Sequence, residues 1–171
     1  MNALIKEATD GDAAQLAEFG ARTFYDSFAA DNTAEDMQSH LDSTFSPQLQ
    51  LAEIRNPDID TLIVLDQGRW AGFAQLRAGK RSAGVPEEGS IELWRFYVDK
   101  AWHGQGMATG LMEAVKQRAR QRGASTLWLG VWQRNARAQA FYRKHGFTKV
   151  GSQVFVVGSD PQTDDVLLCA L

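Results

Sequence analysis

Short apolar runs alternate with longer stretches of helical periodicity along the chain, and this pattern predicts a mixture of strands and helices. Runs rich in β-branched and aromatic residues predict strands at residues 3–8, 61–65, 70–76, 91–98, 126–131, 150–157 and 165–171. Apolar spacings of three and four predict helices at 9–28, 33–41 and 47–54, and further helices after Gly106 and Asn135. Because strands and helices mix without strict alternation, we expect a mixed sheet with helices on its faces.

The stretch from Glu92 to Met112 joins a predicted strand, a turn of small residues and the start of a helix. The turn is His103-Gly104-Gln105-Gly106-Met107-Ala108, so another molecule can approach its backbone N–H groups closely. A helix that begins there points free N–H groups and the positive end of its dipole outward. The stretch therefore predicts a site for an anion, most simply phosphate.

Two common phosphate loops do not match this turn. Thr109 stands where the dinucleotide fingerprint needs a third glycine, and the Gly-Lys-Ser/Thr of the triphosphate loop is absent. The turn instead resembles the Gln/Arg-x-x-Gly-x-Gly/Ala motif of GCN5-related N-acetyltransferases, with His103 in the first place. Residues 135–147 resemble that family's second signature, Asn-x-x-Ala-x-x-Phe-Tyr-x-x-x-Gly-Phe, at every defined position.

This resemblance implies a GNAT fold of the α/β (α+β) class, with a mixed, mostly antiparallel sheet of six to seven strands. Helices cover both faces of that sheet, and acetyl-CoA lies where strands 4 and 5, here about 91–98 and 126–131, splay apart. The pantetheine arm is then expected on the backbone of residues 96–98, and the diphosphate on residues 104–109. The cofactor-binding residues implied are Phe96, Tyr97, Val98, His103, Gly104, Gln105, Gly106, Met107, Ala108, Thr109, Asn135 and Lys144.

The implied reaction moves an acetyl group from a thioester to an amine by direct attack. Tyr142, placed beside the sulfur by the resemblance, is the expected general acid. Glu92 is the candidate general base, and a plain strand-edge carboxylate is the alternative. The Val98 amide is a candidate to hold the acetyl carbonyl.

For the acceptor, the segments 23–32 and 155–165 resemble PaiA-like spermidine/spermine N-acetyltransferases. A polycation needs carboxylates and aromatic faces, and the candidate substrate-binding residues of these types are Tyr25, Phe28, Asp31, Trp132 and Asp164. Phe28 is equally compatible with a core aromatic, and Asp31 and Asp164 are equally compatible with acids that solvate a loop. Phe24, Trp94 and Trp128 are expected in the core rather than on a substrate wall.

The chain has 171 residues, 44% of them hydrophobic and 23% charged, which suits a single N-acetyltransferase domain spanning 1–171. A net charge of −3 disfavours a nucleic-acid partner, and the basic run of residues 116–122 is expected to be a solvated helix face. No signal peptide or apolar membrane span is recognisable, which favours a cytoplasmic protein without membrane contact. The three histidines lack metal-ligand spacing, so no metal is expected.

The leading hypothesis is an acetyl-CoA-dependent N-acetyltransferase for a small primary amine, with polyamines first. An amino acid, an aminoglycoside and a protein N-terminus remain alternative acceptors. A CoA-binding regulator without turnover is the alternative of another class, and a DNA-binding regulator is disfavoured by the acidic charge balance. The oligomeric state is open and includes a homodimer.

Overall fold

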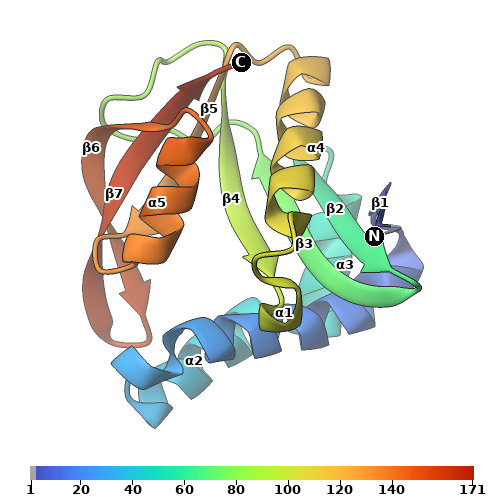
Figure 1. Cartoon of the computed structure of the whole chain (residues 1–171). Coiled ribbons are helices and arrows are strands. Elements are labelled where there is room, and N and C mark those ends of the chain that lie inside the picture. Colours follow the sequence, from blue (N-terminus) through green and yellow to red (C-terminus); the bar gives the residue numbers. More distant parts are fainter. Residues whose placement is uncertain (1–2) are drawn as a thin grey trace.

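A computed structural model of the chain, described for residues 3–171, contains a seven-stranded sheet in the order β1-β2-β3-β4-β5-β7-β6 (Figure 1). Its strands are β1 (Ala3–Glu7), β2 (Ile59–Asp66), β3 (Arg69–Arg77), β4 (Ser90–Val98), β5 (Thr126–Trp132), β6 (Thr148–Val157) and β7 (Asp160–Ala170). All neighbours are antiparallel except β4 and β5. The expected mixed, mostly antiparallel sheet is therefore confirmed.

The parallel pairing of β4 with β5 is short. It joins only Ser90 to Thr126, Ile91 to Leu127 and Glu92 to Trp128. Beyond Glu92 the two strands diverge (Figure 1), so the remainder of β4 lacks a partner on this side. The sheet thus splays between its fourth and fifth strands, as the family resemblance implies.

A bulge in β4 changes which residues face which side of the sheet. β3 pairs Gln75 with Arg95 and Leu76 with Leu93, which leaves Trp94 as an extra residue. Because a bulge shifts the alternation of side chains, Phe96 follows Leu93 onto one face. Arg95 consequently lies on the opposite face and donates to Gln75 and Glu53.

Helices pack on both faces. α4 (Met107–Gln121) buries Leu111, Met112 and Val115 against the sheet in the main core, to which α5 (Ala136–Lys144) contributes Tyr142. The other face is covered by α1 (Ala13–Phe28), α2 (Ala34–Thr44) and α3 (Pro47–Arg55), with Phe19 packed on the β3 residue Phe73. Short 3₁₀ turns occupy Asp10–Asp12, Ala29–Asp31 and Lys100–Trp102.

Two expectations need correction. β7 begins at Asp160 rather than at 165, because the β6–β7 hairpin turns within Gly158 and Ser159. Pro161 is tolerated in this strand since β5 reaches only as far as Asp164 along β7, so its missing N–H removes no bond to β5. Residues 116–122 are also not a purely solvated face, because Arg118 and Arg122 both bind a buried carboxylate in β2, that of Asp60.

No helix within residues 3–171 has the length and apolar character needed to cross a membrane. Cys169 is buried, as its place in an apolar terminal run indicates.

Candidate active site

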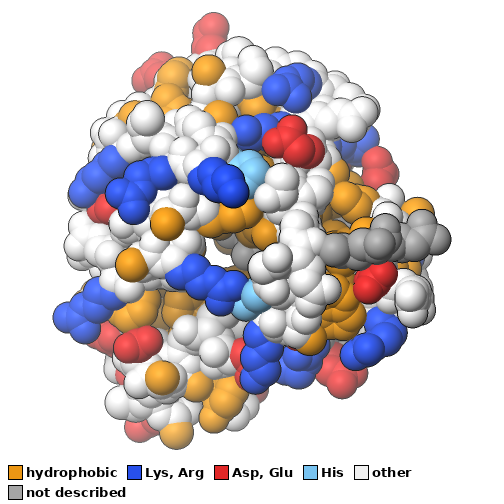
Figure 2. Space-filling view, in the orientation of Figure 1, with side chains coloured by type: hydrophobic (Ala, Val, Ile, Leu, Met, Phe, Trp, Pro, Cys, Tyr) orange, Lys and Arg blue, Asp and Glu red, His pale blue; other side chains and the backbone are white. Residues whose placement is uncertain are grey.

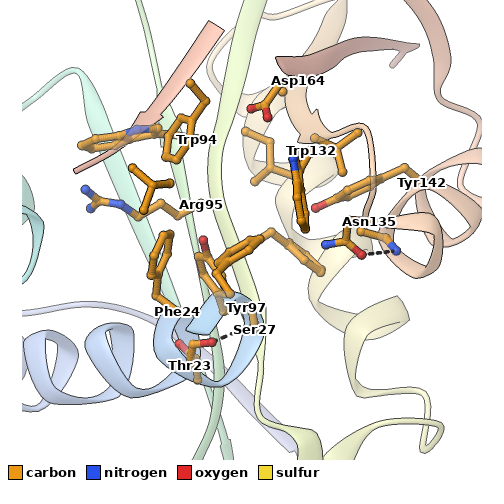
Figure 3. A pocket seen from close by; sticks show the side chains of 18 of the residues that line it. Thr23, Phe24, Ser27, Trp94, Arg95, Tyr97, Trp132, Asn135, Tyr142 and Asp164 are labelled. Carbon is orange, nitrogen blue, oxygen red and sulfur yellow. Dashed lines mark hydrogen bonds between the residues drawn. The ribbon is translucent and has the colours of Figure 1, made fainter. Parts of the chain in front are cut away.

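A cleft of about 870 Å³ occupies the gap where β4 and β5 part. Figure 2 shows this face of the molecule hollowed near its centre, with Lys, Arg and His side chains at the rim. Figure 3 shows the two walls of the pocket: Trp94, Arg95 and Tyr97 on one side, and Trp132, Asn135, Tyr142 and Asp164 on the other.

At one end of the cleft, the glycine turn leads into α4 with an open backbone. Gly104 and Gly106 have φ of 76° and 81°, a left-handed conformation that favours glycine. A Cβ added at either position would meet no atom within 4 Å. The first intrahelical bond of α4 runs from Gly110 N–H to Gly106 O, which leaves the N–H groups of residues 107–109 without helical partners. This arrangement can hold a phosphate group.

His103 occupies the place of the family's Gln or Arg. Its Nε2 lies 2.7 Å from the carbonyl oxygen of Val98, so the ring ties the turn to the end of β4. Lys100, His103 and Arg137 line the cleft and supply positive charge or hydrogen-bond donors near the helix start.

The unpaired edge of β4 forms a wall of the cleft. Phe96, Tyr97 and Val98 all line it and lie beyond the last β4–β5 pair, that of Glu92 with Trp128. A strand edge without a partner can bind an extended molecule that carries amide groups.

α5 places two polar groups on the opposite wall. Asn135 caps the helix, and its Oδ1 accepts from Ala138 N–H at 3.1 Å, which leaves its amide nitrogen on the cleft side (Figure 3). Tyr142 is 8% exposed and packs against Phe147, while its hydroxyl points into the cleft (Figure 3). Burial raises the Tyr142 pKa well above its ordinary value, so the phenol stays protonated. Its O–H can donate into the cleft, and its oxygen can still accept a hydrogen bond.

Glu92 lines the cleft but is already paired. Its Oε2 accepts from Arg77 Nε and lies within 2.8 Å of Arg77 Nη2. Trp94 lies between two guanidinium groups, with those of Arg77 and Arg95 at 4.0 and 3.7 Å from its ring. Trp94 and Trp128 both line the cleft, so the expectation that they belong to the core rather than to a wall is wrong for Trp94. Trp128 is only 2% exposed, so it belongs to the buried interior and also lines the cleft.

Asp164 is a buried carboxylate on β7 that faces the cleft, with 7% of the residue exposed. Within residues 3–171 no group donates to its carboxylate oxygens, because the hydrogen bonds and the ion pair at this point of β7 go to the next residue, Asp165. Burial, with a smaller contribution from the neighbouring Asp165 charge, raises the pKa of Asp164 to about 6.

Aromatic side chains close the end of the cleft near α1. Phe28 packs on Phe24 and approaches Trp132 across the gap, with ring centroids 6.3 Å apart. His40 stacks on Phe24 at 4.3 Å, and its burial and the Arg95 charge lower the His40 pKa. A neutral imidazole therefore borders this end of the cleft.

The structure brings eleven of the nineteen predicted site residues to the lining of the cleft. Five more belong to the glycine turn and the start of α4, between or next to the lining residues His103 and Ala108: Gly104, Gln105, Gly106, Met107 and Thr109. The remaining three lie away from the cleft. Tyr25 is 53% exposed, Asp31 borders a separate shallow pocket, and Lys144 is on the surface of α5. None of these three lines the main cleft. The side chain of Met107 points into the core, so only its backbone can serve an anion.

Sequence reasoning missed several lining residues, namely His40, Phe45, Arg77, Lys80, Arg81, Arg95, Gln153 and Phe155. The sequence offered a signal for only one of them, Arg95, which is the one charged residue in the run from Leu93 to Val98. Within the described residues, no group of three His, Cys, Asp or Glu is arranged to hold a metal ion.

Comparison with known proteins identifies the family. The profile of the acetyltransferase (GNAT) family matches residues 21–147. An uncharacterised N-acetyltransferase encoded in the pepI 3′ region of Lactobacillus delbrueckii subsp. lactis is 31% identical over 167 residues, covering 98% of this chain and 96% of that protein. An uncharacterised N-acetyltransferase of Mycobacterium tuberculosis is 33% identical over 157 residues, covering 92% and 96%.

The fold has solved counterparts as well. The crystal structure of PaiA N-acetyltransferase from Thermoplasma acidophilum in complex with coenzyme A superposes over all of both chains with a TM-score of 0.80, at 19% identity. At that identity the likeness shows a shared fold alone. The family profile and the curated relatives carry the further conclusion that this chain is an N-acetyltransferase of the GNAT family.

Proposed function

We propose that the cleft binds acetyl-CoA with its diphosphate on the backbone N–H groups of residues 104–109. The pantetheine arm then runs along the free edge of β4 at Phe96–Val98, with the Asn135 amide as a donor to it. The observation that carries this proposal is the continuity of one cleft from the start of α4 to the Tyr142 hydroxyl. The PaiA structure that shares this fold contains coenzyme A, which supports the same ligand here.

In this arrangement the thioester sulfur lies beside Tyr142. The coenzyme A thiol has a pKa near the cysteine value of about 8.5, well below the raised pKa of the phenol. The phenol therefore stabilises the departing sulfur first by donating a hydrogen bond to it. It transfers its proton to the sulfur only when it takes up another proton at the same time. The Val98 amide is the candidate donor to the acetyl carbonyl.

The acceptor is a primary amine on a small molecule, with polyamines as the first candidate. Asp164 supplies a carboxylate without an ion-pair partner in the described part of the chain, and Phe28 with Trp132 supplies aromatic faces that suit a polycation. A second candidate is an amine that also carries a carboxylate. Lys80, Arg81 and the Arg77–Arg95 pair around Trp94 line the same cleft and favour it.

The test is thiol release from acetyl-CoA over a panel that contains spermidine, spermine, amino acids and aminoglycosides. Binding of acetyl-CoA is measured separately by calorimetry. We expect binding and amine-dependent thiol release, with spermidine or spermine turning over fastest if the carboxylates dominate the cleft. Binding without release for any amine would instead support a regulator that has lost turnover, and no binding would refute the proposal.

A further inference from the structure

An acceptor amine reaches the cleft mostly as an ammonium ion, because simple amines titrate near the lysine value of about 10.4. It must lose a proton before its nitrogen can attack. Glu92 is poorly suited to take that proton. Its carboxylate already lies within 2.8 Å of two Arg77 nitrogens, and a guanidinium at that distance both occupies the oxygen and repels an incoming ammonium.

The position of Asp164 suits it to accept the proton of the acceptor ammonium. In the β5–β7 register it lies opposite Trp132, on the face of the sheet that lines the cleft. The neighbouring β5 residue is Gly130, and a Cβ there would lie 2.5 Å from Gln153 Nε2 and 3.0 Å from Asp164 Oδ2, so the space above this glycine is shared by the two side chains. The absent side chain leaves room for the carboxylate, which is directed into the pocket away from its own strand (Figure 3).

Asp164 also lacks any partner that would compensate its charge. The residue is 7% exposed, and no described residue donates to its oxygens. A buried carboxylate without a donor is costly unless it is protonated or binds a cation. An ammonium ligand supplies both a charge and the missing hydrogen bonds.

Other titratable groups around Asp164 modify its charge only modestly. On its own strand, Asp165 adds a negative charge but is bound to Lys149 and Gln133. From β4, Tyr97 faces it. Burial raises the Tyr97 pKa to about 12; the Arg95 charge works in the opposite direction, and the Asp164 charge adds a smaller rise. Arg95 itself is bound to Glu53. Two other groups line the same cleft, His40 from α2, held neutral by burial, and the Arg77–Glu92 pair.

We infer that Asp164 is the general base of the reaction, an inference that rests on the proposed acetyl transfer. The Asp164 carboxylate takes one proton from the acceptor ammonium. The freed amine attacks the thioester carbonyl carbon, so that a C–N bond forms and the C–S bond breaks. The second proton on nitrogen reaches the departing sulfur through the Tyr142 hydroxyl, which gives one proton and regains another. The proton on Asp164 returns to water, and the products are an amide and the free thiol.

The experiment compares the pH dependence of kcat/KM in the wild type, Asp164→Asn, Glu92→Gln and Asp165→Asn, using the best amine of the panel. Wild-type kcat/KM should rise on the acid side with an apparent pKa near 6. Asp164→Asn should lower kcat about 10²- to 10³-fold and remove this limb, while the Kd for acetyl-CoA stays unchanged. Formate should partly restore the rate of Asp164→Gly, because a small carboxylate can enter the vacated space.

Two controls make the result specific. Asp165→Asn changes the adjacent residue, which points to the other face, and should keep kcat and the acid limb. That limb should move slightly to lower pH, because a neighbouring negative charge is lost. Glu92→Gln should keep the limb, whatever its effect on the rate.

Two outcomes would overturn the inference. One is an Asp164→Asn variant that keeps kcat and the limb and shows only a raised KM, which would make the carboxylate an ammonium anchor. The other is loss of the limb in Glu92→Gln. Both outcomes are measured with a wild-type enzyme that releases thiol. If the proposed function itself is wrong, the wild type releases no thiol with any amine, so the two failures can be told apart.

Discussion

Replacing Asp164 with Asn is expected to stabilise the folded protein at neutral pH, in addition to its effect on catalysis. The buried carboxylate has no donor among the described residues, so the folded state resists its ionisation and its pKa rises to about 6 from 3.8. Asparagine has a similar shape and no charge. The site would then exchange stability for a reactive carboxylate, as active sites commonly do.

The magnitude follows from the shift. About two pKa units correspond to about 3 kcal/mol at about 1.4 kcal/mol per unit, if the whole shift is expressed in stability. Because the carboxylate faces a cleft that opens to solvent, we expect about 1–2 kcal/mol. Between about pH 4 and 6 the folded state retains a proton that the unfolded state has lost. Wild-type stability therefore falls relative to Asp164→Asn as pH rises through that window, and the difference is complete above it.

The assay is urea unfolding of both proteins from about pH 4 to pH 8, with unchanged m-values as the check that both unfold alike. Asp165→Asn is the matched control with the opposite sign. The bond to Lys149 lowers the Asp165 pKa from 3.8, so the stability that this carboxylate contributes is fully present above about pH 4 and is lost only at lower pH. Asp165→Asn should therefore be less stable than the wild type by a constant amount from about pH 4 to pH 8. A difference between wild type and Asp164→Asn that stays constant over the whole pH range would refute the reasoning.

Three further predictions test other parts of the molecule. Tyr142→Phe should lower kcat about 10²- to 10³-fold with the acetyl-CoA Kd unchanged, and an unchanged kcat would remove the phenol from the reaction. Gly106→Val should abolish acetyl-CoA binding by calorimetry. Gly123→Val, which has the same left-handed φ and open surroundings at the other end of α4, should bind normally, and equal loss in both would point to strain instead. Asp60→Ala should lower the free energy of unfolding by about 2–3 kcal/mol and leave kcat unchanged, because two partly buried arginine side chains, 28% and 33% exposed, lose their shared carboxylate. An unfolding midpoint in urea equal to that of the wild type would contradict this role of Asp60.

Much of the local structure could be predicted from nearby residues. Thr33 and Ser46 cap their helices through side-chain oxygens, and Asn135 does the same for α5. The glycine turn at 103–106 adopts the positive φ values for which glycine is suited. Each of these features depends on interactions within a few positions along the chain, so the residue order alone is enough to predict it.

The partners of several charged groups, inside the cleft and outside it, could not be predicted in this way. Arg77 neutralises Glu92 only because β3 and β4 pair in one particular register. Arg118 and Arg122 leave the solvated face only because α4 crosses above Asp60 of β2. Trp94 lines the cleft because a bulge in β4 changes which side chains point to which face of the sheet.

By itself, the sequence determined the family and the conformation of the glycine turn, and it singled out Tyr142 as a candidate, because these depend on contiguous motifs and short-range backbone preferences. The tertiary structure alone decided which of the two cleft carboxylates has an ion-pair partner. Glu92 and Asp164 are both acids on buried strands, and they differ in what distant segments bring beside them: a guanidinium at 2.8 Å from Glu92, and the bare backbone of Gly130 beside Asp164. A carboxylate's proton affinity follows from its desolvation and its nearest charges, and only the folded chain sets these.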